Sequence, residues 1–416
     1  MKRITITFIL FISLIHSQKI LIPMDQTQND HLKAYGIAYY VLKRNINVEW
    51  LLNFQGGSFL IDNHPFIQAE CKIRGVSFLE LGNELLDIYS TIEENNMDIV
   101  LLEKAPNIAI YSPPNKQPWD DAVTLALTYA EVDYKTLWDE EVINNTLDKY
   151  DWLHLHHEDF TGQYGKFYRN YHNAPWYIEQ KTRFENLAKK FGMKSVHEEK
   201  KAISRIIKNY ISNGGFLFAM CSATDSYDIA LSLENIDGVH SVFDGTPIDK
   251  DIVDKIDFSK SLAFTNYKIY TDPMIYEFSD IDYPPSHNPI TRGAEADYFS
   301  LFEFSAKYDP VPTMLTQNHV PIVKGFMGQT TGFNKNMIKN HVIIMGEDPA
   351  SDQVKYLHGN FGKGTYTFYG GHDPEDYQHF VGDPPTDLSL HRNSPGYRLI
   401  LNNILFPAAR KKEKKT

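Results

Sequence analysis

The most restrictive feature of this sequence is an apolar run from Phe216 to Met220 (FLFAM), directly after Gly214 and Gly215. Apolar and polar residues do not alternate in it, so a strand made of these residues would be apolar on both faces. Such a strand fits the centre of a parallel sheet that helices cover on both sides. The run therefore predicts an α/β fold with a fully buried central strand.

Strand-like and helix-like segments alternate through much of the chain, as in βαβ units. We expect strands at 19–23, 48–53, 98–102, 107–111, 134–137, 152–156, 340–345 and 365–369, with a turn at 362–364. We expect helices at 30–43, 119–130, 181–191, 197–213, 222–233 and 398–405. This order predicts a doubly wound parallel sheet, in which ligands bind beyond the carboxyl ends of the strands.

Changes in composition divide the chain further. Periodicity weakens between about 234 and 339, where Pro, Asp, Tyr and Phe accumulate, so 236–335 is predicted to be an insertion or cap. The core is then expected at 105–235 and 336–409, with an N-terminal α/β segment, 18–104, packing on it. Residues 410–416 form a basic tail, which we interpret as a solvated terminus.

The first seventeen residues have the layout of a cleavable signal peptide. Lys2 and Arg3 precede an apolar run at 4–15, and Ser17 offers a small residue for cleavage before Gln18. A run of twelve residues is too short to span a membrane, which takes about 20 apolar residues in a helix. We therefore expect an exported, soluble protein, periplasmic or extracellular, without a transmembrane segment.

Charge and cysteine content narrow the class of protein. Loss of Lys2 and Arg3 moves the net charge from −12 to −14, which disfavours a nucleic-acid partner. Cys71 and Cys221 are the two cysteines of the sequence, too few for a disulfide framework in an exported protein. The core is therefore expected to hold by packing.

Cys221 stands where the apolar strand meets the next predicted helix. Ala219 and Ala223 are small, as the tight turn of a nucleophile elbow requires. Helix N–H groups near Ser222 would stabilise a thiolate or an oxyanion. The alternative is a packed structural thiol, since free cysteine is among the most buried residue types.

A second group of polar residues follows the strand at 365–369. Two glycines precede His372, and Asp373 and Glu375 follow it closely. A cysteine nucleophile needs a base, and the base needs a carboxylate that orients it. His372 with Glu375 or Asp373 supplies both, although a glycine-rich turn with a locally bonded histidine is equally compatible with the sequence.

A third group consists of His154 and His156, on the strand expected at 152–156, with His157 and Asp159 just after it. His154 and His156 share one face of a strand and His157 points the other way, so at most two are expected in one site. No cofactor is favoured, because the spacing matches no standard zinc motif. A divalent metal on these histidines remains an alternative, beside substrate contacts from His157 and Asp159 or a buried histidine network.

Two weaker features lie elsewhere. Gly56 and Gly57 follow the strand at 48–53 and could present N–H groups to an oxyanion, although a plain turn is an alternative. Aromatic residues crowd the stretch 167–177, which suits a wall that stacks a sugar or a peptide as well as ordinary packing.

With these residues in view, the chain resembles the class I glutamine amidotransferase-like superfamily, over 107–233 and 340–405. The resemblance implies a flavodoxin-like sheet, with Cys221 as nucleophile, His372 as base and Glu375 as its partner. The elbow departs from the family's Gly-x-Cys-x-Gly, and the ending departs from His-Pro-Glu. At whole-chain level the sequence also looks like an exported bacterial family often labelled asparagine synthetase B, but it lacks the ATP-binding Ser-Gly-Gly-x-Asp-Ser loop of true asparagine synthetases.

These observations predict a Cys-His-acid hydrolase acting on an amide, ester or peptide-like substrate. The competing prediction is a non-catalytic envelope protein that binds a small molecule, peptide or glycan through the same strand ends. A further alternative is a metal-dependent hydrolase centred on the histidines.

Overall fold

The computed structural model describes residues 19–114, 121–283, 298–309, 311–325, 328–376 and 382–409. The predicted signal peptide and the basic tail lie outside these residues, as do the first two positions of the helix expected at 119–130. In the described part of the chain, no helix combines the length and the apolar character needed to cross a membrane.

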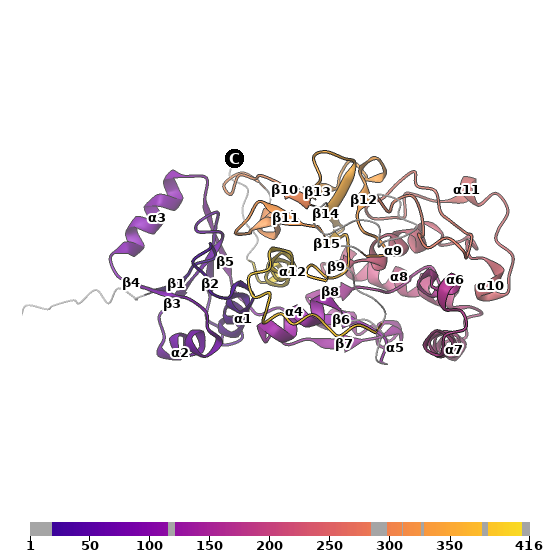
Figure 1. Ribbon diagram of the computed structural model, residues 1–416, viewed down its shortest axis with the longest axis horizontal. Helices are drawn as coiled ribbons and strands as arrows, with labels where there is room; N and C mark the ends of the chain where they lie inside the picture. Colours follow the sequence, from indigo (N-terminus) through magenta and orange to yellow (C-terminus); the bar gives the residue numbers. More distant parts are fainter. Residues whose placement is uncertain are drawn as a thin grey trace, which may run out of the picture.

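The larger of two sheets is half parallel and half antiparallel (Figure 1). Its parallel strands lie in the order β7 (Lys135–Leu137), β6 (Ile108–Tyr111), β8 (Trp152–Leu155), β9 (Phe216–Met220) and β15 (Gly364–Tyr369). Antiparallel strands continue from β15 as β14 (Gln353–Phe361), β13 (Ile343–Glu347), β10 (Tyr298–Leu301) and β11 (Ile322–Lys324), and β12 (Phe333–Asn334) pairs with β14.

The prediction of a parallel sheet is therefore right for one half only. Gly362 and Lys363 form a two-residue turn between β14 and β15, and so short a connection can join only antiparallel strands. Strand β14 itself was not predicted.

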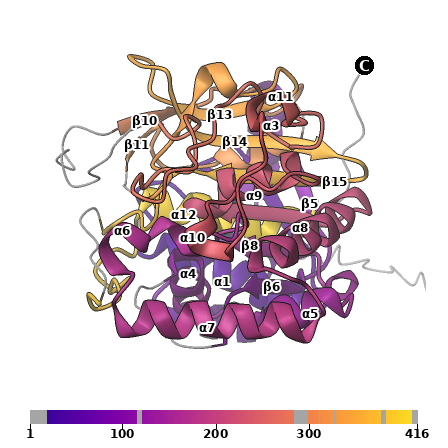
Figure 2. The same cartoon turned by 90° about the vertical axis from the view of Figure 1, so that its right-hand side faces the viewer.

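Strand β9 is buried on both faces, as its apolar run predicts. Phe216, Phe218 and Met220 belong to the apolar cluster that includes α4 (Ala122–Ala130) and α12 (Pro395–Leu405). Leu217 and Ala219 belong to the cluster on the other face. The second face is covered by α5 (Asp139–Ile143), α7 (Pro175–Lys190), α8 (Val196–Ser212) and α9 (Ser222–Ser232). Figure 2 shows α7 along the lower edge of the molecule, with β10 and β13 in its upper part.

The N-terminal segment forms a sheet of its own. Its strands lie in the order β4 (Leu79–Leu81), β1 (Lys19–Ile22), β3 (Ser58–Asp62), β2 (Val48–Leu52) and β5 (Asp98–Leu102), and all the pairs are antiparallel. Three helices accompany it: α1 (His31–Leu42), α2 (Pro65–Arg74) and α3 (Glu84–Glu94). The βαβ units expected here are split: α1 joins β1 to β2, which run parallel, but β3 lies between them and pairs antiparallel with both.

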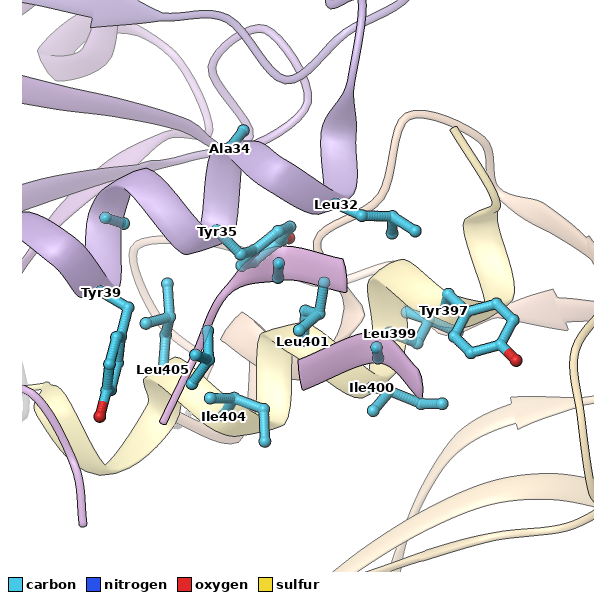
Figure 3. Packing of buried hydrophobic residues seen from close by; sticks show 14 of the residues in the cluster. Leu32, Ala34, Tyr35, Tyr39, Tyr397, Leu399, Ile400, Leu401, Ile404 and Leu405 are labelled. Atoms are coloured by element: carbon cyan, nitrogen blue, oxygen red, sulfur yellow. The ribbon is translucent and has the colours of Figure 1, made fainter. Parts of the chain in front are cut away.

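Helices α1 and α12 hold the two sheets together (Figure 3). Side chains of α1, including Tyr35, face those of α12, including Leu401, and both helices also pack against α4. The guanidinium of Arg398 donates to the Tyr35 hydroxyl at 3.1 Å and to the Met24 carbonyl at 2.6 Å. The N-terminal sheet is thereby fixed to the core by both apolar and polar contacts.

The segment predicted as an insertion or cap contributes β10, β11 and β12 to the large sheet. It also carries α10 (Ser241–Asp244), α11 (Ile252–Lys255) and the 3-10 helix η5 (Val311–Thr316). The buried carboxylate of Asp228, on α9, accepts the backbone N–H groups of 262, 263 and 264 at 2.7 to 2.9 Å. Further short helices in the described part of the chain are α6 (Tyr168–Tyr171), η1 (Leu147–Lys149), η2 (Tyr164–Lys166), η6 (Lys335–Met337) and η7 (Phe406–Ala408).

Replacing Leu401 by Ala should lower the free energy of unfolding by about 2 to 5 kcal/mol, because Leu401 is fully buried between α1 and α12. Urea unfolding followed by circular dichroism measures this loss. The control is Leu390→Ala, at a side chain that is 77% exposed, which should change stability by less than about 0.5 kcal/mol. Equal effects of the two substitutions would contradict the proposed packing.

Candidate functional site

The carboxyl ends of β8, β9 and β15 lie side by side. Leu155 pairs with Ala219, and Met220 pairs with Tyr369. Beyond these ends, the Cys221 N–H donates to the Gly371 carbonyl at 3.1 Å, and the Ala223 N–H donates to the His156 carbonyl at 3.2 Å. The structure therefore brings together the three groups of polar residues that the sequence placed after separate strands.

Cys221 has a backbone conformation that few non-glycine residues adopt. Its φ is 49° and its ψ is −137°, at the junction between β9 and α9. Positive φ is strained for a residue with a Cβ atom, and such strain persists only where the surrounding structure holds it. Ala219 and Ala223 are both fully buried on either side of the turn. This is the sharp strand-to-helix turn that a nucleophile elbow needs.

The Cys221 thiol is 4% exposed, and it is a free cysteine. Burial raises its pKa to about 11, although the backbone N–H groups of Gln329, Ser222 and Thr330 favour the thiolate. The thiol is therefore protonated at neutral pH, and a base is needed before it can attack.

Three histidines, His156, His157 and His372, form what we call the imidazole cluster. The ring centroids lie 3.7 Å apart for His156 and His157, 4.8 Å for His156 and His372, and 4.5 Å for His157 and His372. His156 and His372 are buried, and His157 is half-buried. The expectation that His157 points away from His156 is wrong, because β8 ends at Leu155 and strand alternation stops there.

Asp121 supports this cluster from the start of α4. One of its carboxylate oxygens, Oδ2, lies 3.2 Å from His154 Nε2 and 3.3 Å from His156 Nδ1. Burial by itself would raise the pKa of Asp121, but its attraction to His154 and His156 prevails and holds that pKa well below the usual value. His154 also bonds the Phe218 carbonyl through Nδ1 at 3.1 Å, and burial lowers its pKa.

The two acids that follow His372 have other contacts. Glu375 lies 3.1 Å from His391 Nδ1. The fully buried Asp373 accepts the Tyr397 hydroxyl at 2.6 Å and the Glu375 N–H at 2.8 Å. These bonds fix the turn against α12, and the pairing of His372 with Glu375 stays a prediction.

Three further predicted residues have structural contacts of their own. Asp159 uses both carboxylate oxygens to accept the N–H groups of Thr161 and Gly165, at 2.7 and 2.9 Å. Gly56 and Gly57 lie in the N-terminal sheet, at the turn between β2 and β3. There the Gly57 N–H donates to the Phe54 carbonyl at 3.0 Å, and the Gly56 carbonyl accepts a hydrogen bond from the Arg398 guanidinium.

Sequence reasoning missed the loop that lies against Cys221. Gln329 and Thr330 aim their N–H groups at its thiol, and the Thr330 carbonyl accepts the Gly371 N–H at 2.8 Å. The Gln329 side chain donates to the carbonyls of Gly165 and Tyr276, at 2.8 and 3.1 Å. The run from Gly328 to Gly332 (GQTTG), small polar residues between glycines, is the signal that could have found this loop.

Buried ionisable groups surround this loop. The Thr330 hydroxyl donates to Asp225 Oδ1 at 2.9 Å, and burial raises the pKa of Asp225 to about 7. Burial also raises the pKa of Asp282 well above its usual value and lowers that of Lys166 to about 8. The environment of Cys221 is therefore polar but buried, which strengthens hydrogen bonds to any ligand.

Comparisons with known proteins do not assign a family. No family model matches the chain, and no curated protein matches it. Two cytoplasmic proteins from Salmonella typhimurium are similar in structure, with 11% and 9% identity and TM-scores of 0.35 and 0.33. The matches cover 74% and 73% of this chain and all of each Salmonella chain. A β-galactosidase from Bacillus circulans matches at 9% identity, over 80% of this chain and 36% of its own, with a TM-score of 0.26. Similarity at this level assigns neither a fold family nor an activity.

Asp225 should make stability depend on pH. Its carboxyl ionises near its usual value of 3.8 in the unfolded chain but at about 7 in the folded protein. Between these values the folded state binds more protons, so the free energy of unfolding falls as pH rises, by up to about 1.4 kcal/mol per pH unit.

Urea unfolding at several pH values between about 4 and about 8 measures this slope. Asp225→Asn, which cannot ionise, should make this slope less steep, although other buried acids such as Asp282 still contribute to it. Asp148→Asn, at an exposed position, should leave the slope unchanged. An unaltered slope in Asp225→Asn would show that the carboxyl is not held protonated.

Proposed function

We propose that this chain is a hydrolase with a class I amidotransferase-like core, in which the Cys221 thiol attacks an amide, ester or peptide-like carbonyl. The observation that carries the proposal is the strained backbone of Cys221, with φ 49° and ψ −137°. A thiol that only fills space gains nothing from this conformation, whereas a nucleophile gains a fixed position at the first turn of a helix.

The order of the parallel strands supports the same proposal. Numbered along the chain from β6, the five strands lie in the order second, first, third, fourth, fifth. This is the flavodoxin-like order, in which ligands bind beyond the carboxyl ends of the strands. Cys221 and His372 follow the neighbouring strands β9 and β15 at that edge.

The residues around Cys221 suit the steps of acyl transfer. His372 takes the proton of the thiol, and the sulfur bonds to the substrate carbonyl carbon. N–H groups of Ser222, Gln329 and Thr330 surround the sulfur, and they stabilise the oxyanion that forms beside it. The imidazolium returns the proton to the leaving amine or alcohol, and water then hydrolyses the thioester to a carboxylic acid and the free thiol.

Export remains part of the proposal, because residues 1–17 have the sequence pattern of a signal peptide. Hydrolysis suits that location because water is the only co-substrate that it needs. ATP-driven amide synthesis, which the asparagine synthetase label implies, consumes ATP, which is scarce outside the cytoplasm.

Alkylation of the native protein tests the nucleophile directly, and Cys71 serves as an internal control. Burial raises the pKa of Cys71 to about 12, and its side chain is fully buried in α2. We expect an electrophilic ester or amide probe to label Cys221 and leave Cys71 unmodified, as measured by peptide mass spectrometry.

Hydrolysis of a panel of activated esters and primary amides gives the second measurement. Cys221→Ala should abolish turnover, His372→Ala should lower it by about 10²- to 10⁴-fold, and Cys71→Ala should retain it. Turnover that survives Cys221→Ala would overturn the proposal. Thermal stabilisation by a peptide or glycan that survives Cys221→Ala, without hydrolysis, would favour the binding-protein alternative.

A further inference from the structure

We propose that the imidazole cluster of His156, His157 and His372 binds one divalent transition-metal ion of the zinc type. This inference goes beyond the hydrolase proposal and does not depend on it, because it stands on the arrangement of the three rings and of Asp121 behind them.

The spacing of the rings suits a metal ion. One ring nitrogen from each histidine can be chosen so that all three lie within 4.8 Å of one another. Nitrogens bound to Zn²⁺ at about 2.0 to 2.1 Å in a tetrahedral site lie roughly 3.4 Å apart. Small side-chain rotations would therefore bring the three nitrogens onto one ion and leave a fourth position for water or a ligand.

His156 supplies the second, independent observation. Its side chain is 2% exposed, and neither of its ring nitrogens makes a hydrogen bond within the described part of the chain. Nδ1 lies 3.3 Å from Asp121 Oδ2, and Nε2 is the nitrogen left for an ion. A buried polar atom without a partner costs roughly 1 to 3 kcal/mol. A metal ion bound to this nitrogen would remove that cost.

Asp121 occupies the position of the carboxylate that commonly bonds the second ring nitrogen of a metal-bound histidine. Its Oδ2 lies 3.3 Å from His156 Nδ1, the ring nitrogen other than the proposed ligand. A carboxylate in this position fixes the tautomer of the ring and raises its basicity toward a metal. Asp121 is itself held, because its Oδ1 accepts the Thr124 N–H at 2.6 Å and His154 contacts its Oδ2.

Metal binding and base catalysis by His372 exclude each other if they use the same nitrogen. A metal-loaded chain should then lose the Cys221-dependent hydrolysis proposed above, so the ion would act as an inhibitor of that reaction. The metal site is nevertheless measurable without any substrate.

The test uses the chain without an affinity tag, stripped with a chelator and dialysed. Zn²⁺ is titrated in competition with a chromophoric chelator, and Co²⁺ binding is followed by visible absorption. We expect one equivalent to bind. His156→Ala and His372→Ala should each abolish stoichiometric binding, and Asp121→Asn should weaken it by about 10- to 100-fold.

His341→Ala, at an exposed position, and Cys221→Ala should both retain the parent affinity. Absence of stoichiometric binding, or equal binding by His156→Ala, would overturn the metal site. Should His156→Ala fail to fold, His372→Ala and Asp121→Asn still decide the question. Alkylation of Cys221 separates the two proposals: a chain that binds metal but leaves Cys221 unreactive overturns only the hydrolase, and a reactive Cys221 without metal overturns only the metal site.

Discussion

The burial of β9 on both faces is the constraint on which the rest of the structure depends. A polar side chain between Phe216 and Met220 would lose its contact with water and would find no hydrogen-bond partner among the apolar side chains on either face. The strand itself therefore carries no reactive group. Polar groups can gather only where the strand ends. The neighbouring strands β8 and β15 end at the same level, and this brings His156, Cys221 and His372 to one edge of the sheet.

The parallel half of the large sheet could be predicted because its signal is local. A fully apolar run, followed at once by a helical pattern, defines both β9 and α9 without knowledge of any other segment. The antiparallel half and the N-terminal sheet could not be predicted in the same way. Periodicity shows that a segment is a strand, but it does not show the direction of its partner, and β2 and β14 each pair with a strand that a short turn sets beside them.

The residues of the candidate site also differ in whether a local sequence pattern marks them. Cys221 and His372 were found because small residues mark the turns around them. Thr330 was missed because its hydrogen bond to Asp225 joins positions 105 residues apart, and no local sequence pattern in either segment predicts that contact. Asp121 could not be predicted as a site residue, because an aspartate before a helix is explained by its role as the N-cap of α4. Its second carboxylate oxygen nevertheless faces His154 and His156.

The contact between α1 and α12 has a consequence for how the molecule assembles. Tyr35 donates to Asn402 across 367 positions of sequence, and the part of α1 that packs against α12 stays uncovered until α12 has been made. Contacts between such distant segments slow folding, because the intervening chain loses conformational entropy before the contact forms and contributes its stabilising energy. The N-terminal sheet therefore reaches its final place against the core only after the segment that contains α12 has been made.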